Sequence, residues 1–198
     1  LLRKFRDEGH HVHVVTPVER REKKSTNLIE EHGVSILQVK TLNIQKTNVL
    51  EKGLGTLAIE YQYLRAIKKN FKNVKFDLIL YSTPPITFTK VINFIKERDN
   101  AYSYLLLKDI FPQNAVDMGM LSNGGFLHKF FQKKEHKLYD SSDTIGCMSP
   151  ANVNYLLKHN SQLSTQKVEE NPNSIIPVEI NYTPAEKTAI RSKYGLPL

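Results

Sequence analysis

The sequence predicts an α/β fold, a doubly wound and mainly parallel sheet with helices on both faces. Strand-like and helix-like segments alternate along the 198 residues at the lengths of repeated strand–helix units. Residues 104–107 form a continuous apolar run at the end of a predicted strand over 102–107, which fits a strand of a parallel sheet that is buried on both faces. The run stops at Lys108 and Asp109, which therefore mark a strand end at the edge where open α/β sheets bind ligands.

Strands are predicted where short segments are apolar and rich in β-branched or aromatic residues. These segments are residues 11–17, 34–39, 77–81, 102–107 and 144–148, with a late extended segment at 168–176. Pro84 and Pro85 follow the third of them and end it, because proline cannot continue a strand ladder.

Helices are predicted between the strands by apolar residues at helical spacing and by capping residues. They cover residues 57–71, 86–97 and 124–140, followed by a helix that opens at Ser149-Pro150 and a short one that Thr183 and Glu186 cap. The charged segment 19–24 and residues 41–54 are expected to be loops.

The composition restricts the class of protein. A net charge of +8 favours an anionic partner, but the charge is spread over several predicted helices and no zinc-ligand or RNA-recognition pattern occurs, so nucleic acid is not expected. The single cysteine, Cys147, excludes a disulfide framework and indicates a reducing compartment. No apolar run is long enough to span a bilayer, and no secretory signal is recognisable. Residues 1–6 read as the middle of a helix, so we expect a first element to precede them.

Two strand ends supply the candidate binding residues. At one of them, the Asp109 carboxylate can accept sugar hydroxyls or take a proton, and the Lys108 ammonium can attract a phosphate. Ser82, Thr83 and Pro84 end the neighbouring strand, and we expect them to form another wall of the same cleft, beside the N–H groups of the next helix. The alternative interpretation is a solvated strand end with a local ion pair beside a rigid turn.

The predicted helix at 124–140 mixes aromatic and basic residues. Such a helix usually packs on a sheet and turns a solvated basic face outward. The alternative is a membrane surface, because aromatic and basic side chains together suit an anionic headgroup layer. The residues that would make this contact are Lys129, Phe130, Lys133, Lys134 and Lys137.

Other reactive residues form no recognisable site. The histidines lack metal-ligand spacing and no carboxylate pair has Asp-x-Asp spacing, so no metal site is expected. Cys147 lies in an apolar strand and is expected to be inert packing. Ser149 lacks the G-x-S-x-G context of a hydrolase nucleophile.

Six segments, taken in order, resemble the acceptor-side domain of bacterial family 4 glycosyltransferases. LLLKDIFPQNAVDMGML resembles the family's L-R-D-hydrophobic-(W/F)-P-(D/Q) segment, and LRKFRDEGHHVHVVTP resembles its early helix and second strand. In NSIIPVEIN, the residues Ile176-Pro177-Val178 stand where the family has Pro-Asn. Within the family, the chain is most similar to the capsule and O-antigen sugar transferases of the fucosaminyltransferase type. The other segments are YSTPPITF, LYDSSDTIGCMSPANVNYLLKH and IRSKYGLP.

The resemblance implies the N-terminal half of a GT-B enzyme, with a Rossmann-like acceptor-binding domain over residues 1–178 that lacks its first strand. Residues 179–198 would be a linker and helix leading to a donor-binding domain that this sequence does not include. The implied enzyme is a retaining glycosyltransferase that needs no metal or other cofactor. It would move a sugar from a nucleotide-sugar to a polyprenyl-diphosphate-linked saccharide at the cytoplasmic face of the cell membrane. Asp109 would be catalytic, and the acceptor-binding residues would be Ser82, Thr83, Pro84, Lys108, Asp109 and Pro112.

Two other functions fit the same sequence. One is a non-enzymatic basic α/β module that docks on a membrane or a protein partner. The other is a fragment of a GT-B sugar-nucleotide epimerase. A second domain with paired glutamates would favour retaining transfer over both.

Overall fold

The computed structural model describes residues 1–45, 47–174 and 182–197, except for the side chains of residues 49, 50 and 52. It confirms an α/β fold in which parallel strands alternate with helices. The strands are β1 (His13–Glu19), β2 (Asn27–Glu31), β3 (Val34–Thr41), β4 (Leu78–Ser82), β5 (Tyr102–Leu107), β6 (Thr144–Cys147) and β7 (Val168–Glu170). The helices are α1 (Leu2–Asp7), α2 (Val49–Asn70), α3 (Thr89–Asp99), α4 (Gln113–Asp117), α5 (Phe126–Ser141), α6 (Pro150–His159) and α7 (Pro184–Lys193), with short 3₁₀ turns η1 (Arg20–Glu22) and η2 (Thr165–Lys167).

The described strands form two hydrogen-bonded sheets. One has the order β1-β3-β2, in which β1 and β3 are parallel and β2 is antiparallel to β3. The other, β4-β5-β6-β7, is parallel throughout. In the second sheet the chain order runs outward from β4 to β7, whereas in the first sheet β3 lies between β1 and β2.

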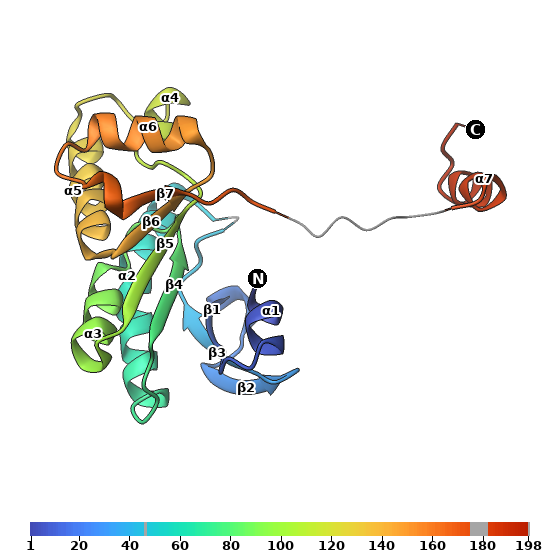
Figure 1. Cartoon of the computed structure of the whole chain (residues 1–198), viewed down its shortest axis with the longest axis horizontal. Coiled ribbons are helices and arrows are strands. Elements are labelled where there is room, and N and C mark those ends of the chain that lie inside the picture. Colours follow the sequence, from blue (N-terminus) through green and yellow to red (C-terminus); the bar gives the residue numbers. More distant parts are fainter. Residues whose placement is uncertain (46, 175–181, 198) are drawn as a thin grey trace.

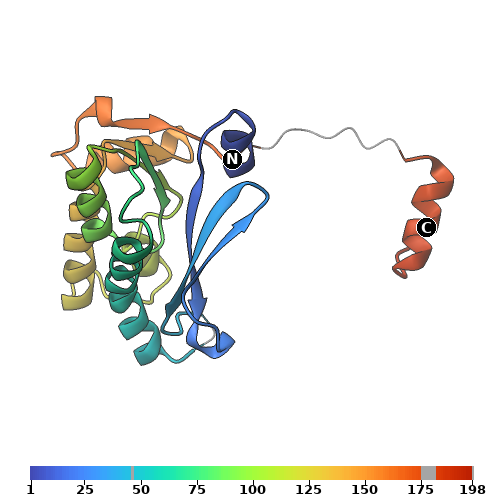
Figure 2. The same ribbon diagram turned by 90° about the horizontal axis from the view of Figure 1, so that it is seen from below.

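Both sheets pack on one layer of helices. A single buried cluster joins Leu37 and Val39 of β3 to residues of α2 and α3, and Val15 of β1 and Ile79 of β4 pack against it. A second cluster holds Leu105 and other residues of β5 and β6 beneath α5 and α6. Figure 2 shows α2, α3 and α5 together on one side of the strands and α1 on the other.

The burial of β5 differs from the sequence prediction. Ser103, Leu105 and Leu107 are fully buried, but Tyr104 and Leu106 on the opposite face are half-buried and Tyr102 is exposed. The prediction that both faces of this strand are buried is therefore correct for one face only, because the helices of the described residues cover that face more completely.

Several predicted boundaries were wrong for identifiable reasons. The strand β2 was missed because its residues are mostly exposed and polar, so no apolar pattern marks it. The predicted loops at 19–24 and 41–54 are partly regular: β1 continues to Glu19 before η1, and α2 begins at Val49, where the Asn48 side chain accepts a hydrogen bond from Glu51 N. The predicted helix at 86–97 begins only at Thr89, and the short helix α4 was not predicted.

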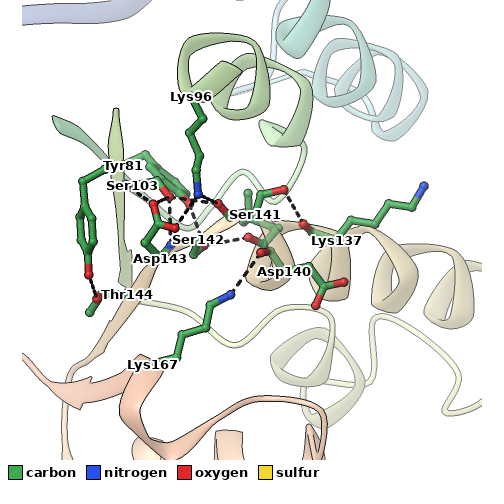
Figure 3. Close-up of polar contacts among 12 residues, drawn as sticks. Tyr81, Lys96, Ser103, Lys137, Asp140, Ser141, Ser142, Asp143, Thr144 and Lys167 are labelled. Atoms are coloured by element: carbon green, nitrogen blue, oxygen red, sulfur yellow. Dashed lines mark hydrogen bonds and ion pairs between the residues drawn. The ribbon is translucent and has the colours of Figure 1, made fainter. Parts of the chain in front are cut away.

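A polar network fixes the ends of the strands opposite the candidate site (Figure 3). The backbone N and Oγ of Ser103 each donate a hydrogen bond to Asp143 Oδ2 at 2.8 Å, and Lys96 Nζ lies 2.7 Å from Asp143 Oδ1. Burial by itself raises the pKa of Asp143, but the hydrogen bonds from Lys96 and Ser103 outweigh it, so the pKa lies below its ordinary value. Tyr81 Oη, from β4, joins the same region through Ser142 Oγ at 2.7 Å.

The remaining features concern the chain as a whole. Among the described residues, no helix combines the length and apolar character needed to cross a membrane. All residues from 182 to 197, including α7, are exposed. The predicted domain boundary at residues 178 and 179 lies outside the described residues, as does most of the segment NSIIPVEIN.

Candidate functional site

The candidate site lies at the carboxyl ends of β4 and β5. The two strands are parallel and hydrogen-bonded neighbours, with Ser82 opposite Leu106 in their register. Their carboxyl ends therefore lie side by side at the same end of the sheet. Open α/β sheets bind ligands outside the carboxyl ends of their strands.

Thr83 joins the two strand ends. Its side chain is buried, and its Oγ1 donates a hydrogen bond to the backbone oxygen of Asp109 at 3.0 Å. The same Oγ1 accepts a hydrogen bond from Asp109 N at 3.2 Å, while Thr83 N donates to Leu106 O. Thr83 therefore holds the backbone of Asp109 and has a supporting position, whereas it was predicted to contact the acceptor.

The side chains of Lys108 and Asp109 are both exposed. Among the described residues, no ion pair joins them, and no hydrogen bond involves the Asp109 carboxylate. The local ion pair of the alternative interpretation is therefore not formed. A carboxylate on a fixed backbone with its oxygens open to solvent can accept hydrogen bonds from sugar hydroxyls.

The prolines near the carboxyl ends of β4 and β5 differ in exposure. The peptide bonds Thr83–Pro84, Pro84–Pro85 and Phe111–Pro112 are all cis. Pro84 is exposed and Ser82 is half-buried, so both can border a ligand. Pro112 is buried at the start of α4 and can shape the site only from beneath.

A second polar cluster on this sheet was missed by sequence reasoning. Tyr104 Oη donates a hydrogen bond to Glu169 Oε1 at 2.6 Å and accepts one from Asn171 Nδ2 at 2.7 Å. Burial and the hydrogen bond to Glu169 raise the pKa of Tyr104 to about 12, so the phenol stays protonated at neutral pH. Gly146 of β6 leaves room for this contact, because a Cβ atom there would lie 2.4 Å from Tyr104 Oη. A glycine inside a predicted strand was the one signal of a close approach.

The basic face of α5 points away from the core. Its buried residues include His128, Glu135, Leu138 and Tyr139, which defines the inner face. The five residues predicted for a membrane surface lie mainly on the outer face: Lys129, Lys133 and Lys137 are exposed, whereas Phe130 and Lys134 are half-buried, with Lys134 Nζ 5.9 Å from the Phe130 ring centroid.

Other features of the described residues offer no competing reaction centre. No group of three or more His, Cys, Asp or Glu side chains there could hold a metal ion. Cys147 is fully buried, and burial raises the pKa of its thiol to about 11, which keeps it unreactive. Shallow grooves of about 420 and 430 Å³ lie on α2 and near Lys96, and neither is lined by residues of the β4–β5 edge.

Comparison with known proteins places the fold. No family model matches the sequence, and no curated protein matches it. Among solved structures, the chain is similar to one from E. coli described as trehalose-6-phosphate bound with UDP-2-fluoro glucose, with a TM-score of 0.58 and 11% sequence identity. The match covers 96% of this chain and 49% of that one, so the present chain spans about half the length of that structure.

The class of fold follows from this match and from the topology. A chain that covers half of that structure, with parallel strands and alternating helices, corresponds to one Rossmann-like half of a GT-B fold. The protein therefore has the fold of a Rossmann-like half of a GT-B enzyme.

Proposed function

We propose that this chain is the acceptor-side half of a retaining glycosyltransferase of the family 4 type. The complete enzyme moves a sugar from a nucleotide-sugar to a polyprenyl-diphosphate-linked saccharide during capsule or O-antigen synthesis. It works at the cytoplasmic face of the membrane, needs no metal or other cofactor, and binds its donor mainly through a second domain. The ordered sequence resemblance to that family and the GT-B fold of the structural neighbour support this proposal.

One observation carries the assignment of the site. The Asp109 carboxylate is exposed at the carboxyl end of β5, on a backbone that hydrogen bonds with Thr83 hold in place. In the proposed enzyme, Asp109 contacts the reacting acceptor hydroxyl, and Lys108 offers a cation to the diphosphate of the lipid carrier. Ser82 and Pro84 border the acceptor, while Pro112 supports the edge from beneath.

The sheet edges agree with the same domain organisation. β4 is an apolar strand, and β1 has the apolar residues Val14, Val15 and Val18, yet each is an edge strand and half-exposed along most of its length. A continuous apolar run such as that of β4 is normal for an interior parallel strand. In the proposed enzyme, a further parallel strand from residues ahead of Leu1 pairs between them and joins the two sheets into one.

The experiment is a transfer assay with the complete protein. It is incubated with a panel of nucleotide-sugars and a polyprenyl-diphosphate-linked N-acetylhexosamine in detergent, and the products are separated and weighed by mass spectrometry. We expect the lipid-linked acceptor to gain the mass of one sugar residue, with retained anomeric configuration by NMR. An altered nucleotide-sugar without any acceptor product would instead indicate an epimerase and contradict the proposal.

A further inference from the structure

Four large apolar side chains are exposed within one short segment between α4 and the first turn of α5. Met118 is 65% exposed, Met120 66%, Phe126 83% and Leu127 53%. We call these four residues the apolar rim. Single exposed apolar residues are ordinary on a protein surface, but a cluster of four within ten residues usually marks an interaction site.

The backbone of this segment is folded back on itself. Met120 N and Leu121 N both donate hydrogen bonds to Ala115 O, at 2.8 and 3.1 Å. Gly125 N donates to Ser122 O, and Gly124 N donates to Nδ1 of the buried His128 at 3.0 Å. The apolar side chains are therefore presented on a segment whose amides are largely satisfied internally, as an apolar environment requires.

The charges around the apolar rim are mostly positive. Lys129, Lys133 and Lys137 follow it along the outer face of α5. Of the two carboxylates of that helix, Glu135 is buried on the inner face, and the exposed Asp140 lies in the last turn, far from the rim. The exposed acid of the segment itself is Asp117, which accepts a hydrogen bond from Gln113. An apolar edge followed by lysines is complementary to an anionic bilayer surface, in which the lysines meet headgroups and the apolar side chains meet the acyl boundary.

The apolar rim lies at the same end of the molecule as the candidate site. The helix α5 starts near the carboxyl end of β5 and runs back along the sheet, as Figure 1 shows. Phe111, two residues beyond Asp109, packs edge to face against Phe131 of α5, with ring centroids 5.1 Å apart. A membrane that holds the rim would therefore lie close to Lys108 and Asp109.

A second surface has a similar composition but a less suitable place. On α2, Leu57 and Tyr61 are exposed near Arg65, Lys68 and Lys69. These cations occupy the second half of α2, which runs away from the carboxyl edge after it leaves β3, and Lys68 is engaged over the Phe94 ring at 4.5 Å. A bilayer bound there would lie far from the candidate site.

We propose that the apolar rim inserts into the interfacial layer of an anionic bilayer while the lysines of α5 bind its headgroups. This inference rests on the proposed lipid-linked acceptor and deepens it, because insertion would bring the carrier's diphosphate to the edge that holds Asp109. The rim residues are the inserted element, and the lysines supply the preference for anionic lipid.

The chain offers a direct test because it contains no tryptophan. In Phe126→Trp, the new indole is the only one within residues 1–198, and the emission of that chain is recorded with vesicles of phosphatidylglycerol and phosphatidylcholine and with phosphatidylcholine vesicles alone. We expect a blue shift and quenching by brominated acyl chains with the anionic vesicles, and a much smaller response without phosphatidylglycerol. Tyr61→Trp on α2 is the matched comparison at an exposed aromatic position and should show neither change.

Loss of binding is measured separately by vesicle co-sedimentation. The double variant Phe126→Ser and Leu127→Ser should bind anionic vesicles at least about tenfold more weakly, because it removes the apolar area that would be buried in the bilayer. Both side chains are exposed, so we expect the double variant to fold normally. An unchanged circular dichroism spectrum is the control for folding.

Three results would overturn the inference. They are an unshifted Phe126→Trp emission with anionic vesicles, a blue shift at Tyr61→Trp in its place, and a Phe126→Trp emission that is already blue without lipid. The vesicle measurements use neither donor nor acceptor, so their failure leaves the transfer assay standing, and a failed transfer assay leaves the vesicle result standing.

Discussion

At the scale of single residues, Thr83 and Asp109 have different roles in the candidate site: one positions the backbone, and the other offers a side chain to the ligand. Thr83 is buried, and its hydroxyl both donates a hydrogen bond to the backbone oxygen of Asp109 and accepts one from the backbone N–H of Asp109. The Asp109 carboxylate keeps its hydrogen-bonding capacity for a ligand. A substitution of the Asp109 side chain therefore changes the chemistry of the edge without breaking the contact that positions it.

Glu135 provides a pH-dependent test of the core beneath α5. It is buried, and burial raises its pKa to about 7, against the opposing effect of the hydrogen bond from Tyr139 Oη. An unfolded glutamate has a pKa near 4.3, so the folded protein binds this proton more tightly and loses stability as pH rises from about 4 through 7.

We therefore expect Glu135→Gln to raise the free energy of unfolding by up to about 3 kcal/mol at pH 8, and by roughly half of that near pH 5.5. Glutamine stays neutral and still offers an oxygen to Tyr139. Urea unfolding at the two pH values measures the difference, with Glu97→Gln as the exposed control. A stability difference that does not change with pH would show that Glu135 is not protonated in the folded state.

At the scale of elements, β1 and β4 each have one edge that no strand of the described residues pairs with. We expect their backbone amides to exchange with deuterium rapidly in residues 1–198, since no strand among the described residues pairs with those edges. A chain that also carries the residues ahead of Leu1 should slow this exchange at least about tenfold in both strands. β5, paired on both sides, is the internal control.

Equal exchange in the long and short chains would contradict the proposed strand between β1 and β4. Slower exchange in β4 alone would show that the residues ahead of Leu1 pair with the second sheet and do not join it to the first.

The elements also show what the sequence could predict. β5 and its end at Lys108 were predictable because a continuous apolar run and its charged stop are local signals. β2 was not, because an exposed edge strand needs no apolar pattern, and its pairing with β3 depends on the fold. The contact between Tyr104 and Asn171 joins residues 67 apart in the sequence, so it becomes visible only once the register of the strands is known.

At the scale of the whole molecule, positive charge and exposed apolar side chains meet at the end that carries the candidate site, as they also do on α2. The net charge of +8 suggested an anionic partner without placing it. The sequence also marked the lysines of α5, but apolar residues such as Phe126 usually indicate core, and only the structure shows this one to be exposed. In the proposed enzyme, the end of the molecule that carries the candidate site faces the lipid. At the opposite end, hydrogen bonds among Ser103, Asp143 and Lys96 tie the strand ends together.

The most direct test of this account is the rate of sugar transfer by the complete protein with Asp109→Asn. The substitution keeps the size of the side chain and leaves the hydrogen bonds of Thr83 to the backbone in place. Asp140→Asn, at an exposed position near the opposite end of the sheet, is the matched control. We predict a fall in transfer rate of about 10²-fold or more for Asp109→Asn, with vesicle binding unchanged and the control near the wild-type rate. A wild-type transfer rate in Asp109→Asn would contradict the claim that this edge of the sheet carries the reaction.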